Sequence, residues 1–293
     1  MQQPSSVVNP HLVSSFGMLL KHWRSKRGIS QLELSLTSQV SQRHISFLES
    51  GRSKPSREMV LELATVLEVP LRQQNLLLTT AGFAPIHTET DLAAPEMSMI
   101  RKAIDLMLLK QEPYPAFAID RYWNLLLTNG AANQLLAAFI DVETLQDRFY
   151  QDGKVKLMQV MFHPQGLRPF VVNWQDVAGQ LLRRVHREAQ SSISKISHQG
   201  VRTVDGKKDR SVELFEELMS YPDVAELWQT SNHVVQNTLL LAIHLKRDQL
   251  ELQFFSTIAT LGTSYDITLQ EVRIECLCPA DEITEQNWLQ LVT

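Results

Sequence analysis

Nine residues in the first fifth of the chain have the types and spacing needed to read DNA. In a helix that begins after Ser41, successive side chains are about 100° apart, so Ile45 and Leu48 face inward together. Arg43 and Phe47 then point outward. Arg and Gln can each make two hydrogen bonds to a base edge, and Arg or Lys suits a phosphate. The predicted DNA-binding residues are Gln31, Ser41, Gln42, Arg43, Ser46, Phe47, Ser50, Arg52 and Lys54.

These residues divide by the part of the DNA that they would meet. Arg52 and Lys54 follow Gly51 in a basic loop and are expected to meet phosphates. Gln31 begins the preceding helix, where its side chain and backbone N–H could bind another phosphate. Phe47 could pack on a thymine methyl group, which we favour, or stabilise the surface that meets a partner. The best candidates for base contacts are Gln42, Arg43, Ser46 and Phe47.

Two short helices joined by a tight turn must position this face. Ser30 and Glu33 have the spacing of a capping box, which satisfies free backbone donors at a helix start. Leu32, Leu34 and Leu36 are expected to form the apolar side of that first helix. The turn is predicted near residues 37–40, and the second helix runs from the Ser41 cap to the Gly51 stop. The alternative is an ordinary helical bundle with a polar face.

Residues 16–83 resemble the helix-turn-helix domain of the Xre/phage-repressor class of bacterial regulators. The resemblance rests on the GISQ-x-EL opening, the V-S-x-x-x-I-x-x-L-E segment and the GRSKPS exit. Further helices are predicted over His11–Lys26, after Ser56, and around Leu76–Leu78 before Gly82. The resemblance implies an all-α N-terminal five-helix helix-turn-helix domain over residues 11–83.

Charge is distributed unevenly along the 293 residues. Residues 1–84 carry nine Lys/Arg and five Asp/Glu, a balance of +4, whereas the remainder balances at −8. The basic excess therefore lies where phosphates would be met. Because it is modest, we expect a homodimer that binds double-stranded DNA at an inverted-repeat operator.

The same composition argues against a membrane or secreted protein. No run of about 18 apolar residues exists, so no membrane span is expected. The first residues, MQQPSSVVNPH, lack the features of a secretion signal and are expected to be disordered over positions 1–10. We expect a bacterial cytoplasmic, nucleoid-associated protein.

A linker is predicted over residues 84–95, and a second domain over 96–293. Residues 96–110 are amphipathic and suit either the first helix of that domain or a dimerisation helix. Residues 190–210 are polar and are expected to form an insertion. The predicted strands are Ala116–Asp120, Asn124–Thr128, Asn237–Lys246, Gln249–Ala259 and Thr268–Cys278. The predicted helices are Gly130–Phe139, Lys156–Phe162, Trp174–Ala189, Val212–Met219, Asp223–Gln229 and Ala280–Val292, the last capped by Asp281. This order indicates an α+β domain with an antiparallel sheet.

Residues 112–292 resemble the MmyB-like ligand-binding domain. The resemblance rests on FAIDRYWNLLLTNGAANQLL, on the stretch containing HP-x-GLRP-x-x-VNW, and on FFSTIATLGTSYDITLQEVRIECLCPADE. It implies a PAS-like fold and a transcription regulator whose C-terminal domain accepts an apolar small-molecule ligand, of the fatty-acid kind.

Within this stretch, Arg168 could hold a ligand carboxylate and Trp174 could form a wall beside an apolar tail. The alternative is that Arg168 and Asn173 tie down a loop while Trp174 fills the core. Leu125, Leu135 and Phe254 are expected in the core, with some of the core residues lining a cavity. The predicted ligand-binding residues are Arg168, Trp174, His163, Asn173, Phe117, Phe139 and Phe162.

Two cysteines, Cys276 and Cys278, fall on one face of a predicted strand. They could form a redox pair or half of a metal site, although two structural cysteines are commoner. His186 and His198 have no spacing that strengthens a metal site. Because no catalytic or cofactor motif is present, we expect no enzyme, cofactor or metal. A redox-responsive regulator, and a regulator whose C-terminal half serves only oligomerisation, remain as alternatives.

Overall fold

The structure, a computed structural model, describes residues 15–192, 209–231, 242–262 and 265–292. The segment expected to be disordered, most of the polar insertion, and the start of the strand predicted from Asn237 lie outside these ranges. The chain divides into two compact units. The described residues up to Thr88 belong to the first, and the segments Glu89–Ala189 and from Arg210 onward form the second.

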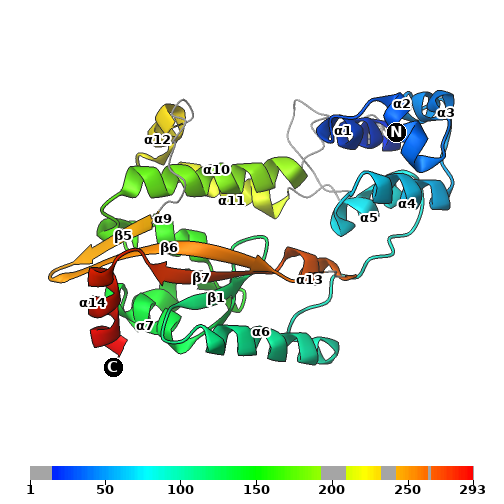
Figure 1. The fold of residues 1–293 in the computed structure, drawn as a ribbon. Helices are drawn as coiled ribbons and strands as arrows, with labels where there is room; N and C mark the ends of the chain where they lie inside the picture. The colour runs from blue at the N-terminus through cyan, green and yellow to red at the C-terminus, as the bar shows by residue number, and fades with distance from the viewer. Residues whose placement is uncertain (1–14, 193–208, 232–241, 263–264, 293) are drawn as a thin grey trace, which may run out of the picture. The chain divides into compact units, whose positions relative to one another are not determined.

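Residues 15–88 of the first unit form five helices, as predicted (Figure 1). Ser15, Ser30, Ser41 and Ser56 each accept a hydrogen bond from a backbone N–H at a helix start, and Ser30 with Glu33 completes a capping box. The helices are α1 Phe16–Lys26, α2 Gln31–Ser38, α3 Gln42–Glu49, α4 Arg57–Val66 and α5 Leu71–Thr80.

The apolar side of α2 was predicted wrongly. Leu34 is fully buried, whereas Leu32 is 52% and Leu36 is 76% exposed. Two positions along a helix turn the side chain by about 200°, so alternate residues lie on opposite sides. Leu32 and Leu36, four apart, therefore share a solvent-facing side.

α1 and α3 approach closely enough that their backbones almost touch at Gly17. A Cβ atom built on Gly17 would lie 2.2 Å from the carbonyl oxygen of Leu48 and 2.8 Å from that of Glu49. Glycine permits this approach because it has no side chain. The core beneath includes Leu20, Leu34 and Ile45.

A five-stranded antiparallel sheet organises the second unit, as predicted. Its order is β2-β1-β7-β6-β5, so the N-terminal hairpin pairs with the C-terminal strand. The strands are β1 Ala116–Ile119, β2 Leu125–Thr128, β5 Ala242–Arg247, β6 Leu250–Thr260 and β7 Arg273–Pro279. A small hairpin of β3 Tyr150–Gln151 and β4 Lys154–Val155 lies outside it, where no element was expected.

Helices cover both faces of this sheet. Figure 1 shows α10 along one side and α6 on the other. α6 packs on Ala116 and Ala118 of β1, whereas the larger core on the opposite face holds Phe117 and Ile119. The helical segments are η2 Pro95–Met97, α6 Ser98–Lys110, α7 Gly130–Phe139, α8 Val142–Thr144, η3 Leu145–Phe149, α9 Leu157–Phe162, η4 Arg168–Phe170, α10 Trp174–Ser192, α11 Arg210–Ser220, α12 Val224–Ser231, α13 Ile267–Glu271 and α14 Glu282–Val292.

The last predicted strand begins too early. Residues Ile267–Glu271 form helix α13, and β7 starts only at Arg273. The Asp266 carboxylate accepts a hydrogen bond from the Thr268 N–H at 2.8 Å, which caps the helix. Asp281 caps α14 in the same way, as predicted, through the Thr284 N–H at 2.7 Å.

Residues 84–94 contain no helix or strand, but both ends of the segment are anchored. The Asn75 side chain of α5 accepts hydrogen bonds from the N–H groups of Ile86 and His87, both at 3.0 Å. Further on, the Thr90 hydroxyl donates to the Asp266 carboxylate at 2.8 Å, and Leu92 is buried in the core beneath α6. Among the described residues, no helix is long and apolar enough to cross a membrane.

Candidate nucleic-acid interface and ligand cavity

The outward face of α3 has the residues that the sequence analysis predicted. Ile45 is 0% and Leu48 is 1% exposed, so the inner side of the helix is fixed by the core. Gln42 and Arg43 are exposed on the outer side. Ser46 and Phe47 beside them are half-buried. The outer side therefore presents two side chains suited to base edges.

A buried carboxylate at the end of α3 fixes this helix to its neighbours. The Glu49 side chain is 5% exposed and accepts two hydrogen bonds from Arg24 of α1, at 2.6 and 3.0 Å. The Gln31 side chain of α2 donates a third at 2.8 Å. The Glu49 hydrogen bond is the main cause that raises the pKa of Arg24. Gln31 thus donates one of its side-chain N–H groups to Glu49, and that group is not available for the predicted phosphate.

Sequence reasoning missed Arg24 and Glu49 as positioning residues. The signal was the L-E pair that ends the recognition segment, because a carboxylate beside the buried Leu48 needs a cationic partner. Arg24 also donates to the Ile29 carbonyl at 2.9 Å, which anchors the loop before α2.

A basic edge continues from α3 into the following loop. The Arg43 guanidinium lies 5.4 Å and that of Arg52 5.9 Å from the Phe47 ring centre. Gly51 has φ +72°, and the Arg52 N–H bonds the Phe47 carbonyl at 2.8 Å, so the chain turns back over the ring. Lys54 is exposed beyond it. Ser41 and Ser50 bond the helix backbone instead.

In the second unit, two of the seven predicted ligand residues, Arg168 and Asn173, bind neighbouring segments of the chain. Arg168 donates to the Pro222 carbonyl at 2.9 Å and to the Asp223 carboxylate at 3.2 Å. The Asn173 side chain donates to the Ala242 carbonyl at 2.7 Å and accepts from the His244 N–H at 3.0 Å. These contacts are the structural alternative that the sequence analysis left open.

His163 and three of the aromatic residues predicted to bind the ligand lie in separate environments. His163 lies edge-on to Phe149 and accepts a hydrogen bond from the Gln165 N–H at 3.1 Å, and burial lowers its pKa. Trp174 packs edge-on against the fully buried Phe162. Phe139 borders a separate groove of about 460 Å³.

Phe117 lines an apolar cavity of about 140 Å³ on the α10 side of the sheet. We call it the apolar cavity. Alternate residues of neighbouring strands form one wall, since side chains of a strand alternate between faces. The sheet contributes Phe117, Leu125, Thr128, Ile243, Leu245, Phe254, Ser256, Glu275 and Leu277. The helices contribute Ala132, Leu135, Leu136, Leu157, Met158, Met161, Val177, Gln180 and Leu181. The loop residues Pro115, Trp123 and Leu167 complete the lining.

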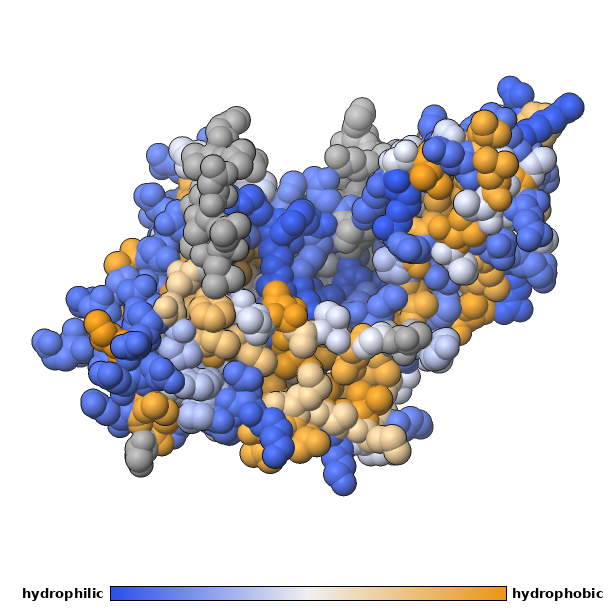
Figure 2. Space-filling view, viewed as in Figure 1, coloured by the Kyte–Doolittle hydropathy of each residue, from blue (hydrophilic) through white to orange (hydrophobic). Residues whose placement is uncertain are grey.

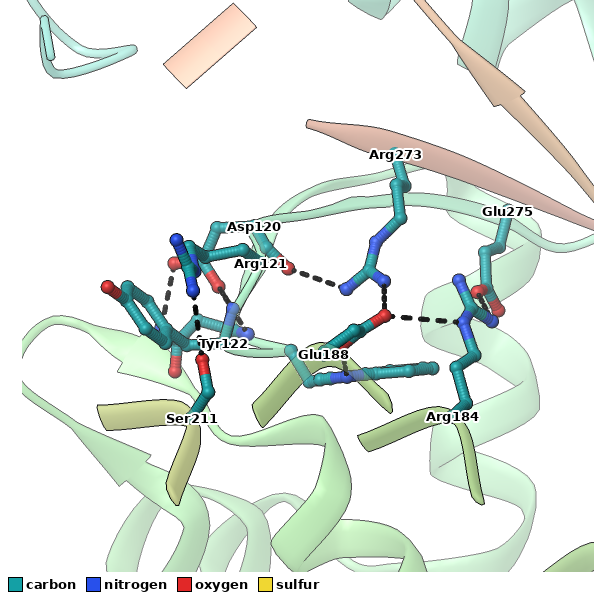
Figure 3. Close-up of polar contacts among 10 residues, drawn as sticks. Asp120, Arg121, Tyr122, Arg184, Glu188, Ser211, Arg273 and Glu275 are labelled. Carbon is teal, nitrogen blue, oxygen red and sulfur yellow. Dashed lines mark hydrogen bonds and ion pairs between the residues drawn. The ribbon is translucent and has the colours of Figure 1, made fainter. Parts of the chain in front are cut away.

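Charged side chains, of which Glu275 is buried and the others are partly buried, border this cavity beside Glu275 and Trp123. We call Arg184, Glu188, Arg273 and Glu275 the charged cluster. Figure 3 shows Arg184 between Glu188 and Glu275, with Arg273 reaching Glu188 and the Asp120 backbone. Burial is the main cause that lowers the pKa of Arg273, whose buried Nε has no hydrogen-bond partner among the residues that the structure describes. Sequence reasoning missed this cluster because α10 and β7 are distant in the chain.

The two cysteines lie near each other on β7 without forming a disulfide. Cys276 and Cys278 are free and half-buried, on the sheet face opposite Glu275. Burial raises the pKa of the Cys276 thiol, which disfavours a reactive thiolate. Within the described ranges, no group of three or more potential ligands could hold a metal ion. His186 packs against Phe215 and Trp228, and His198 lies outside those ranges.

The fold and the exposed α3 define the class of helix-turn-helix DNA-binding proteins, and residues 20–74 match the Helix-turn-helix family. Residues 100–291 match the MmyB-like transcription regulator ligand binding domain. Since that match covers more than half of the chain, the protein belongs to the MmyB-like family of transcription regulators. No curated protein matches the chain. Both matched families occur in regulatory proteins, which confirms the prediction of a transcription regulator.

Proposed function

We propose that this transcription regulator reads an inverted-repeat operator as a homodimer and responds to an apolar small molecule in the apolar cavity. The ligand that we propose has a fatty-acid-like hydrocarbon chain, as the family resemblance implies. The observation that carries the proposal is the cavity itself, because apolar pockets with a few polar groups are where small molecules bind.

The base-reading part of the proposal rests on α3. Gln42 and Arg43 stand exposed, while the inner residues and Glu49 hold the helix in place. A helix supported in this way can enter a major groove without being ordered first, which would otherwise cost affinity.

The dimer part of the proposal rests on α6. Met99, Leu106, Met107 and Leu109 are all exposed large apolar residues of this one helix, and Figure 2 shows hydrophobic residues gathered over it. We propose that a second copy of this chain covers this surface. A twofold contact uses the same surface on both copies, and an inverted repeat needs two copies of α3.

Native mass spectrometry of gently purified full-length protein tests the ligand part. We expect a bound apolar molecule in the wild type and in Arg168→Ala, because Arg168 is engaged by Pro222 and Asp223 and does not line the cavity. Leu181→Trp should exclude the molecule by filling the cavity. Loss in Arg168→Ala but not in Leu181→Trp would place the ligand at the loop that the sequence indicated. No molecule in any sample, together with no ligand response in operator titration, would favour a C-terminal unit that serves only oligomerisation.

A further inference from the structure

Glu275 is the one charged residue that lines the apolar cavity in the part of the chain that the structure describes. Its side chain is 8% exposed, and its register opposite Phe117 places it on the cavity face of the sheet. The remaining polar side chains of the lining are Thr128, Gln180 and Ser256. Any molecule in the cavity therefore meets a buried carboxylate.

This carboxylate already has a cationic partner. Arg184 donates to Glu275 at 2.6 Å, and its Nε lies 3.7 Å from Glu188. Glu188 also pairs with Arg273 and accepts a hydrogen bond from the Trp123 indole at 2.8 Å. The two guanidinium groups lie over the Trp123 ring at 4.3 and 4.6 Å.

The charged cluster is balanced. Its four residues are two arginines and two glutamates, so the formal charges of these four side chains sum to zero. Adding a net charge beside the buried Glu275 and its largely buried partners is unfavourable, because the new charge has left water without gaining a partner. A bound carboxylate would add a negative charge beside Glu275, and an ammonium group a positive charge beside Arg184.

We propose that the apolar cavity selects an uncharged molecule that carries a hydrogen-bond donor, an alcohol or a primary amide on an apolar chain, and that this donor binds Glu275. The inference rests on the proposed function, since it concerns the same site. It separates the hydrocarbon part of the ligand from its polar end: the walls accept an alkyl chain, while the carboxylate disfavours a free acid.

The volume of the apolar cavity limits the size of the molecules that can test the proposal. An apolar protein cavity of about 150 Å³ holds a molecule of the size of benzene. The 140 Å³ here is therefore suited to about six to eight heavy atoms in the observed side-chain arrangement. The isomers 1-hexanol and methyl pentyl ether are matched in composition, but only the alcohol has a donor, and hexanoate supplies the anion.

The test is isothermal titration calorimetry of full-length protein, first freed of bound apolar molecules on a hydrophobic resin, at pH 7.5. We expect 1-hexanol to bind about tenfold more tightly than methyl pentyl ether, because the free energy of a hydrogen bond to a charged acceptor corresponds to about that ratio of affinities. Hexanoate should bind most weakly. Equal affinities for alcohol and ether, or hexanoate as the tightest of the three, would overturn the inference and leave the proposed regulator intact. If none of the three binds, both the inference and the proposed cavity function are wrong.

Two variants test the role of Glu275. Glu275→Gln removes one of the two carboxylates that neutralise the arginines of the charged cluster, so the preference for alcohol should shrink and hexanoate should gain at least about tenfold. Glu271→Gln is the matched control, because Glu271 pairs with Arg121 at 3.0 Å in the same unit but does not line the cavity. It should keep the wild-type order. An unchanged order in a folded Glu275→Gln, checked by circular dichroism, would overturn the assignment. If that variant does not fold, the wild-type order alone decides.

Discussion

Arg43 is the residue whose chemistry is most specific to base reading. It is exposed near the start of α3, within 5.4 Å of the Phe47 ring centre. Arg43→Ala should weaken operator binding by about 1–3 kcal/mol and relax the preference for one base pair. Fluorescence anisotropy with operator variants measures both effects.

Arg52 and Lys54 provide the comparison for Arg43. Arg52→Ala and Lys54→Ala should weaken binding to all sequences alike and reduce the salt dependence, as expected of phosphate contacts. If Arg43→Ala behaved like these two variants, Arg43 would bind the backbone and not a base.

Arg24 is another single residue with a testable role, which is to stabilise the fold of the first unit. It supplies both hydrogen bonds of the Arg24–Glu49 pair, and only 12% of its side chain is exposed. Arg24→Ala would leave a buried carboxylate unpaired, so we expect a loss of about 3 kcal/mol in the free energy of unfolding of the first unit. Urea denaturation followed by circular dichroism measures it. Lys21→Ala, at an exposed position of the same helix, should change the free energy by less than about 0.5 kcal/mol. Equal effects would show that the ion pair adds nothing.

At the scale of elements, the close approach of α1 and α3 at Gly17 predicts that alanine at this position lowers the stability of the first unit. Helix propensity alone predicts that alanine raises it. Alanine in a helix interior is normally about 1 kcal/mol better than glycine. Here its Cβ would lie 2.2 Å from a backbone oxygen of α3, so Gly17→Ala should instead destabilise the first unit by about 3 kcal/mol. Thermal melting checks the sign, with the exposed Met18→Ala as the control. A stabilised Gly17→Ala would mean that the two helices separate easily.

The elements that the sequence predicted well are those with strong local signals. The serine caps at Ser30, Ser41 and Ser56 and the glycine stops marked the helices of the first unit. The errors arose where a local pattern was ambiguous. The apolar run after Asp266 was assigned to a strand, although a capped turn of helix precedes β7. Leu32 and Leu36 were expected on the apolar side of α2 together with Leu34, but residues two apart lie on opposite sides of a helix.

The apolar cavity could not be predicted from short sequence patterns. The alternation of β7 was visible in the sequence, but which face meets α10 depends on pairing between β1 and β7, more than 150 residues apart in the chain. The opposition of Phe117 and Glu275 is a product of that register. For the same reason, Arg168 looked more promising than Arg184, because only the former stood in a recognisable motif.

At the scale of the whole molecule, the exposed side of α6 predicts the oligomeric state. Leu106→Asp places a charge among Met107, Leu109 and their counterparts in the second copy, so the homodimer should dissociate. Analytical ultracentrifugation measures the mass, and Asp105→Ala, also exposed on α6, is the control that should stay dimeric.

Leu106→Asp also tests whether DNA binding depends on the homodimer. The wild type should protect an inverted repeat whose half-site centres lie about 10 base pairs apart, or a multiple of that spacing. Monomeric Leu106→Asp should lose most of its affinity for this site. A wild-type footprint on one asymmetric half-site would contradict the dimer, whatever the mass in solution.

Four consecutive residues of β7 alternate between two different environments. Glu275 and Leu277 face the apolar cavity, whereas Ile274 and Cys276 face α6. Because strand side chains alternate, deleting Ile274 alone would shift the preceding or the following residues by one position and exchange the faces. Thiols would then line the ligand site, and a carboxylate would be pressed into the core beneath α6. Insertions and deletions should therefore be rejected in this strand during directed evolution of new ligand specificity, while substitutions at Glu275 and Leu277 remain open to selection.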